Sequence, residues 1–199
     1  SVPRSMKARP CLNFSVKPSI TWKQLATSMP FSDFPHFSIQ PALNTDQNQI
    51  VNLIGDCYQE YGDQVVLHGD DSDLLDIEGN YRGREGEFIV VRNETGVIIA
   101  THAVVPLDQH ARLCTFRRLY LHSQLRGTGL GKALMIWAID WAREAGFRRV
   151  EFWSDTRFAR AHTFFGKLGF QTRGETRDMN DGFQPYSEFF FWLDITPNS

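Results

Sequence analysis

The stretch "LHSQLRGTGLGKALMIWAIDWAREAG", residues 121–146, decides the fold of this chain. A strand-like run ends at its start, Gly127, Gly129 and Gly131 follow, and an amphipathic helix fills the remainder up to a final glycine. A glycine-rich turn that enters a helix leaves several backbone N–H groups unpaired and pointing one way, and the helix dipole adds partial positive charge there. The stretch therefore predicts a cradle for a phosphate or pyrophosphate group.

Two well-known nucleotide-binding motifs fit this spacing poorly. A Walker A loop needs G-x-x-x-x-G-K-[ST], but Gly127 and Gly131 are one residue too close, and Ala133 stands where the metal-binding hydroxyl belongs. A dinucleotide fingerprint needs G-x-G-x-x-G, and Lys132 occupies the place of its last glycine. That fingerprint also belongs to a sheet with repeated crossovers, whereas this chain shows one strand–helix crossover after a run of strands. Binding of a nicotinamide dinucleotide stays a minor alternative.

Hydrophobic periodicity predicts the order strand, helix, three strands, helix, strand, helix, strands. The run at 187–195 is continuously apolar, which predicts a strand buried on both faces. The predicted strands cover residues 37–40, 112–121, 148–154 and 187–195, with a hairpin around the turn at 93–96. The predicted helices cover residues 46–61, a short segment within 70–79, the residues after the glycines, and 159–170.

Length and composition predict one globular domain, 36–199, after a proline-rich basic arm, 1–35. The net charge of −2 gives no basic field for nucleic acid, and no apolar run is long enough to cross a membrane. The histidine spacing predicts no metal site, and three scattered cysteines favour the reducing cytoplasm. Exposed tryptophans and the arm together suggest a homodimer.

Four pieces of the sequence together resemble the GNAT superfamily of N-acetyltransferases. "RLYLHSQLRGTGLGKAL" contains R-x-x-G-x-G and looks like that family's pyrophosphate-binding motif, and a helix ending in "AREAGF" follows it. "VEFWSDTRFARAHTFFGKLGF" resembles the family's next strand and helix, and the order of segments from 37 to 195 also agrees. The resemblance implies an α/β fold with a mixed, mostly antiparallel central sheet of about six to seven strands, flanked by helices and containing a splayed central pair.

The resemblance implies acetyl-CoA as the donor substrate. The glycine-rich amides would hold its pyrophosphate, and its pantetheine arm would pair with a central strand. An amide near Leu119 or Tyr120 would face the thioester oxygen and act as the oxyanion hole. The cofactor-binding residues implied in this way are Leu119, Tyr120, Leu121, Arg126, Gly127, Thr128, Gly129, Leu130, Gly131, Lys132, Phe158, Phe165 and Lys167.

The implied reaction is direct attack of a primary amine on the thioester. Many family members carry a tyrosine acid at the position of Phe165 and a glutamate in the central strand near Thr115 or Arg117, and this sequence has neither. Other residues must then move the protons. The candidates are Tyr120 as the acid, and His102, Glu151, Glu85 or Glu87 as the base.

The acceptor amine is open from the sequence, and both small compounds and peptides fit. Arg117 and Arg118 could select an acceptor that carries a carboxylate or a phosphate, or they could simply be solvated. Because the usual acid and base are missing, a sensor or subunit that binds acyl-CoA with little turnover is the alternative to an enzyme.

Overall fold

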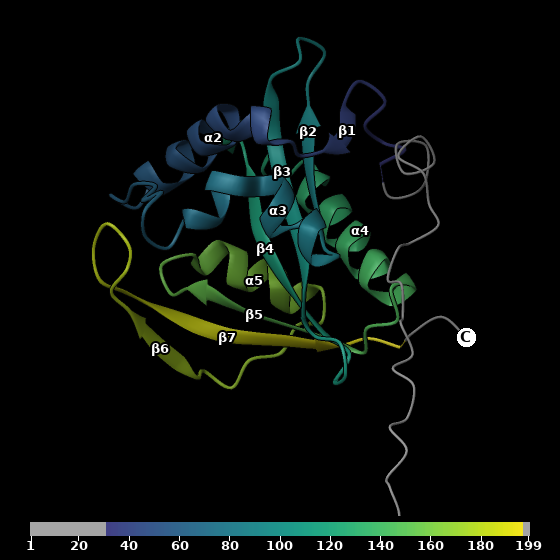
Figure 1. Cartoon of the computed structure of the whole chain (residues 1–199), viewed down its shortest axis with the longest axis vertical. Helices are drawn as coiled ribbons and strands as arrows, with labels where there is room; N and C mark the ends of the chain where they lie inside the picture. The colour runs from purple at the N-terminus through teal and green to yellow at the C-terminus, as the bar shows by residue number, and fades with distance from the viewer. Residues whose placement is uncertain (1–30, 197–199) are drawn as a thin grey trace, which may run out of the picture.

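The computed structural model describes residues 31–196, and the first thirty residues of the predicted arm lie outside that range. The described chain forms one seven-stranded mixed sheet with helices on both faces (Figure 1). The strand order is β1-β2-β3-β4-β5-β7-β6. The strands are β1 (Ser38–Pro41), β2 (Glu87–Arg92), β3 (Ile98–Asp108), β4 (Leu113–Leu121), β5 (Arg149–Asp155), β6 (Thr176–Met179) and β7 (Tyr186–Asp194). The helices are α2 (Gln47–Gln59), α3 (Ile77–Asn80), α4 (Leu130–Glu144) and α5 (Ala159–Lys167), with a 3-10 helix, η2 (Ser72–Asp76), before α3.

The helices cover the sheet in two separate cores. One core lies under α4 and α5, and α4 contributes Leu130, Leu134, Trp137 and Ala138 from the single apolar face that its periodicity predicts. The other core lies under α2, η2 and α3, against the half of the sheet formed by β2 and β3. In Figure 1, α2 and α3 accordingly lie over the upper part of the sheet, away from β7 and β6.

The predicted splayed pair is confirmed. β4 and β5 run parallel but pair only at Leu113 with Arg149 and at Cys114 with Val150. Beyond these positions the strands diverge, and Figure 1 shows β5 turning away from β4. The remaining strand pairs are antiparallel, so the mixed, mostly antiparallel sheet is confirmed as well.

A β-bulge interrupts β4 just where it diverges from β5. Thr101 pairs with Tyr120 and Ala103 with Arg117, so β4 has one residue more than β3 between these pairs. Arg118 lies in the bulge with a φ of +58°, and its carbonyl accepts a hydrogen bond from the Thr101 hydroxyl at 2.7 Å. The bulge turns both Arg117 and Arg118 toward the α2 side, where they approach the same carboxylate of Asp73.

Two sequence expectations change in the structure. β7 is not buried on both faces, because none of the described helices covers its second face; arginine side chains lie over Trp192 there, and Phe190 is half-buried. The four tryptophans among the described residues are buried or half-buried, so they provide no exposed aromatic patch for a homodimer.

In addition, Phe31 packs into the core under α4. Within residues 31–196, no helix is long and apolar enough to span a membrane.

Candidate functional site

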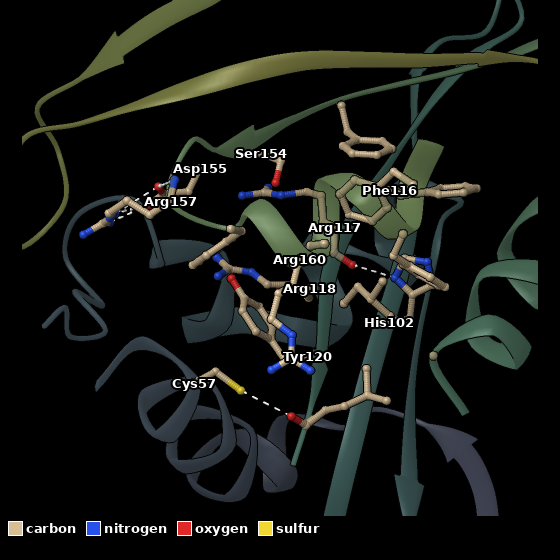
Figure 2. Close-up of a pocket in the computed structure, with 18 of the residues that line it drawn as sticks. Cys57, His102, Phe116, Arg117, Arg118, Tyr120, Ser154, Asp155, Arg157 and Arg160 are labelled. Atoms are coloured by element: carbon tan, nitrogen blue, oxygen red, sulfur yellow. Dashed lines mark hydrogen bonds and ion pairs between the residues drawn. The ribbon is translucent and has the colours of Figure 1, made fainter. Parts of the chain in front are cut away.

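A cavity of about 570 Å³ opens where β4 and β5 diverge. Both cores contribute to its wall: Phe116, Leu119 and Phe165 from the side of α4 and α5, and Tyr58 and Tyr120 from the side of α2. The cavity therefore passes through the sheet at the gap between the strands. Figure 2 shows its lining residues converging from β4, β5 and the adjoining helices.

The glycine-rich turn forms one end of this cavity, and Gly127, Gly129 and Gly131 all line it. Gly127 and Gly129 have φ values of +83° and +96°, which only glycine adopts without strain. α4 begins directly afterwards at Leu130. Among residues 31–196, the amides of these three glycines and of Lys132 have no acceptor within the protein. These four amides are thus donors without a protein acceptor at a helix N-terminus, and that they bind an anion stays a prediction.

The cationic side chains beside the cradle differ in whether a carboxylate of the protein already pairs with them. Arg126 donates two hydrogen bonds of 2.6 Å to the carboxylate of Glu60, so much of its charge is neutralised within the protein. Lys132 is exposed and lines the cavity. Arg160 on α5 also lines it, a residue that the sequence analysis did not single out. Lys132 and Arg160 are therefore the cations best placed to meet a phosphate.

Most of the implied cofactor-binding residues line the cavity, and three do not. Leu130 is fully buried in the core under α4. The Thr128 hydroxyl is turned back to donate to the Leu125 carbonyl at 2.7 Å, and Lys167 lies at the end of α5, outside the lining. Those that line it are Leu119, Tyr120, Leu121, Arg126, Gly127, Gly129, Gly131, Lys132, Phe158 and Phe165.

Three of the five predicted proton carriers, Tyr120, His102 and Glu151, have different surroundings. The Tyr120 hydroxyl donates to the Tyr58 hydroxyl at 3.0 Å, and burial raises the pKa of Tyr120 to about 12. His102 is buried, its Nδ1 lies 3.2 Å from the Arg117 carbonyl, and burial lowers the pKa of its imidazole to about 3. The Glu151 carboxylate pairs with Arg149 at 2.7 Å and does not line the cavity. The first two residues reach the cavity; the third does not.

A buried ionic cluster ties the bulge of β4 to the segment before α3. The Arg118 guanidinium, 5% exposed, pairs with Asp71 at 2.6 Å and with both carboxylate oxygens of Asp73. The Tyr81 hydroxyl donates to the same Asp73. Arg118 is therefore occupied within the protein, whereas Arg117, 43% exposed and 3.7 Å from Asp73, remains open to a ligand.

On the α2 side, the far end of the cavity is lined by groups that the sequence patterns did not indicate. Asp70 accepts a hydrogen bond of 3.0 Å from Tyr186, and Arg157 joins Asp63 to Asp155. These residues come from segments far apart in the chain, and no local motif marks them. The nearest signal in the sequence is the segment at 70–79, for which the sequence predicts only a short helix.

The fold agrees with those of solved acetyltransferase structures. An acetyltransferase from Streptococcus agalactiae superposes with a TM-score of 0.70 at 21% identity, covering 81% of this chain and all of that one. A phosphinothricin acetyltransferase from Sinorhizobium meliloti, solved in complex with acetyl-CoA, superposes with a TM-score of 0.62 at 16% identity, covering 81% of this chain and 89% of that one. The architecture is therefore that of a GNAT-like acetyltransferase.

Sequence comparison leads to the same family. Residues 48–170 match the acetyltransferase (GNAT) family, and this chain belongs to it. N-acetyltransferase 8F1 of Rattus norvegicus is 31% identical over 107 residues, which are 52% of this chain and 48% of that protein. The chain thus spans about half the length of the curated relatives it first matches.

Proposed function

We propose that this chain transfers the acetyl group of acetyl-CoA to a primary amine. The observation that supports this most directly is the set of amides without a protein acceptor, those of Gly127, Gly129, Gly131 and Lys132, at one end of a cavity that separates β4 from β5. A Cβ atom built on Gly131 would stand 3.6 Å from Leu121 and 3.9 Å from Phe164, in the space between β4 and α5. The residues present therefore fit a pyrophosphate that lies against bare backbone.

In this proposal each part of the cavity has one task. The cradle amides, with Lys132 and Arg160, hold the phosphates of acetyl-CoA. The unpaired edge of β4 beyond Cys114 offers Leu119–Leu121 to the amide groups of the pantetheine arm, as an added strand would use it. A backbone amide at the bulge, near Leu119 or Tyr120, stabilises the oxyanion. Phe158 and Phe165 add apolar wall beside the arm.

The acceptor amine enters from the α2 side. Because the cavity passes through the sheet, a donor on the side of α4 leaves the opposite mouth free, where Asp70, Tyr186 and Arg117 lie. A carboxylate at this mouth favours a cationic amine. The open Arg117 favours an acceptor that also has an anionic group, and both small compounds and peptides meet this description. A homodimer and a cytoplasmic location stay predictions from the sequence alone.

The proposed function is tested with the full chain by two measurements. Acetyl-CoA should raise the melting temperature, and CoA thiol should be released when a panel of amines is added. Stabilisation by acetyl-CoA without release above buffer for any amine would favour the sensor that binds acyl-CoA without turnover. Stabilisation by NADH and not by acetyl-CoA would overturn the proposal in favour of a dinucleotide-binding protein.

The exposed cation of the cradle should matter more than the one at the end of α5. Lys132→Ala is expected to raise the Kd for acetyl-CoA by about tenfold, because it removes a charge-assisted contact that is partly screened by solvent. Raising the salt concentration should shrink this difference. Lys167→Ala is the matched comparison, and isothermal titration measures both variants. An equal loss in Lys167→Ala would mean that the phosphates lie further along α5 than the cradle.

A further inference from the structure

The proposed reaction needs a proton carrier that the predicted candidates do not readily supply. Phe165 has no proton to give, and the Tyr120 hydroxyl is directed to Tyr58. His102 is buried with an imidazole pKa of about 3, so it is a weak base. Yet a proton must leave the attacking nitrogen and another must reach the departing sulfur.

A serine–histidine pair reaches the same cavity through its serine. Ser154 is on β5 and lines the cavity, and Figure 2 shows its hydroxyl pointing from the strand toward the interior. Its Oγ lies 3.1 Å from Nε2 of His162 on α5. His162 precedes Phe165 by one helical turn, and their ring centroids are 6.3 Å apart. The pair thus lies beside the position where the GNAT resemblance places a tyrosine acid.

Strand register brings Ser154 opposite the proposed oxyanion hole. Cys114 and Val150 are the last paired residues of β4 and β5, and Ser154 follows Val150 by four positions. Four positions along β4 from Cys114, with one more for the bulge, lead to Leu119. Ser154 therefore lies, by register, across the gap from the part of β4 whose amide would meet the thioester oxygen.

The packing holds the imidazole in place. Its ring lies 5.5 Å from the Phe189 ring and 5.1 Å from the Phe191 ring, both on β7. Burial lowers the pKa of His162 below its usual value, although the backbone and carboxylate of Asp155 act in the opposite direction. Near neutral pH the ring is consequently uncharged, and an uncharged imidazole has one nitrogen free to accept a proton.

We propose that Ser154 and His162 form the proton relay of this acetyltransferase, Ser154 as the catalytic residue at the reacting atoms and His162 as its positioning base. The amine reacts in its neutral form, after a cationic acceptor has lost its first proton to solvent. As the N–C bond forms and the C–S bond breaks, Ser154 accepts a proton from the attacking nitrogen and passes its own proton to Nε2 of His162. The same two groups then return one proton to the sulfur, so CoA leaves as the thiol and both residues are restored. This relay rests on the proposed function.

The test compares Ser154→Ala and His162→Gln with two controls that lie outside the cavity, His110→Gln on the loop before β4 and Thr163→Val on α5. Both relay variants should lower kcat by about 10²-fold, which is within the usual contribution of general acid–base groups. Their Kd for acetyl-CoA should stay within about twofold of the parent, because neither residue holds the phosphates. The controls should keep both values.

Two further readouts separate a relay from a structural role. In the parent, kcat should fall at low pH as His162 becomes protonated, and this limb should disappear in His162→Gln. The charged groups that act on the ring are Asp155 and, through it, Arg157; β7 and Phe165 present only aromatic rings to it. Placing a hydroxyl at the family position, as Phe165→Tyr within His162→Gln, should restore at least about tenfold of the lost rate.

Ring nitrogen chemical shifts give a measurement that does not depend on turnover. In the parent, Nε2 of His162 should be unprotonated at pH 7.5, and Ser154→Ala should shift its resonance. A protonated Nε2, or relay variants with the parent's kcat, would overturn the relay while leaving the proposed function intact. If the parent binds acetyl-CoA but acetylates no amine, the proposed function falls and the relay falls with it.

Discussion

Gly131→Val is expected to raise the Kd for acetyl-CoA by at least about 100-fold while the domain stays folded. Gly131 lies in the first turn of α4 without a positive φ, so valine enters without backbone strain. Its Cβ meets only ordinary contacts with Leu121 and Phe164, but the side chain fills the gap in which the proposed pyrophosphate approaches bare amides. Losing two charge-assisted hydrogen bonds is sufficient for a change of this size.

The matched control is Gly166→Val on α5. A Cβ at Gly166 meets nothing within 4 Å, and Gly166 does not line the cavity. Both variants should melt within a few degrees of the parent, and only Gly131→Val should lose stabilisation by acetyl-CoA. Gly129→Val is a less clean test, because at a φ of +96° valine adds strain to crowding. If Gly131→Val binds acetyl-CoA as the parent does, the pyrophosphate lies elsewhere.

Arg118→Met is expected to lower the free energy of unfolding by about 3–5 kcal/mol, the usual cost of removing one partner from a buried ion pair. The reason is that Asp71 and Asp73 would keep their positions beneath the surface without the guanidinium that compensates them. Arg117→Met is the matched control: Arg117 is the neighbouring residue, is 43% exposed and lies 3.7 Å from Asp73, so its loss should cost less than about 1 kcal/mol. Urea unfolding at pH 7 measures both variants.

The stability difference should depend on pH. Burial raises the pKa of Asp73, but the charges and hydrogen bonds of Arg118, with Arg117 and Tyr81, outweigh it and hold the pKa below its usual value. A carboxylate with a depressed pKa stabilises the fold above the unfolded pKa and loses that contribution as the pH falls through the folded value. The gap between Arg118→Met and the parent should therefore narrow below about pH 4. A gap that stays constant from pH 7 to pH 3 would show that packing, and not the ion pair, is responsible.

The parts of the fold with strong local signals were predictable from the sequence. The apolar face of α4, the turn at 93–96 between β2 and β3, and the glycine-rich entry to α4 each follow from neighbouring residues, and the structure has them where the patterns place them. β6 has no such signal, because three of its four residues are polar and it pairs, among the described strands, with β7 alone. The second face of β7 was mispredicted because a run of apolar residues does not reveal that arginine guanidinium groups, and not a helix, lie over the Trp192 ring.

The site was only partly predictable for a related reason. Cradle residues are consecutive, so their spacing reveals them. Arg118 and Asp71 are 47 residues apart, and the bulge that turns Arg117 and Arg118 to one side cannot be seen from alternation along the strand. Ser154 and His162 belong to adjacent elements, but only the packing of α5 on β5 brings the hydroxyl to the imidazole. In each case the missing information is tertiary.

Because Arg118 in the bulge anchors the acceptor side of the cavity, that side could be exchanged by protein engineering without changing the cradle. The segment before α3 is tied to β4 through Arg118, Asp71 and Asp73, while the glycine-rich cradle lies on the other side of the sheet. A variant in which the residues around Asp70 are replaced, but Asp71 and Asp73 are kept, should fold with the same ion pairs to Arg118 on β4. Such chimaeras should acetylate different amines while their affinity for acetyl-CoA stays unchanged. The side of the domain that carries the cradle could then be kept constant while the acceptor side is varied in a library.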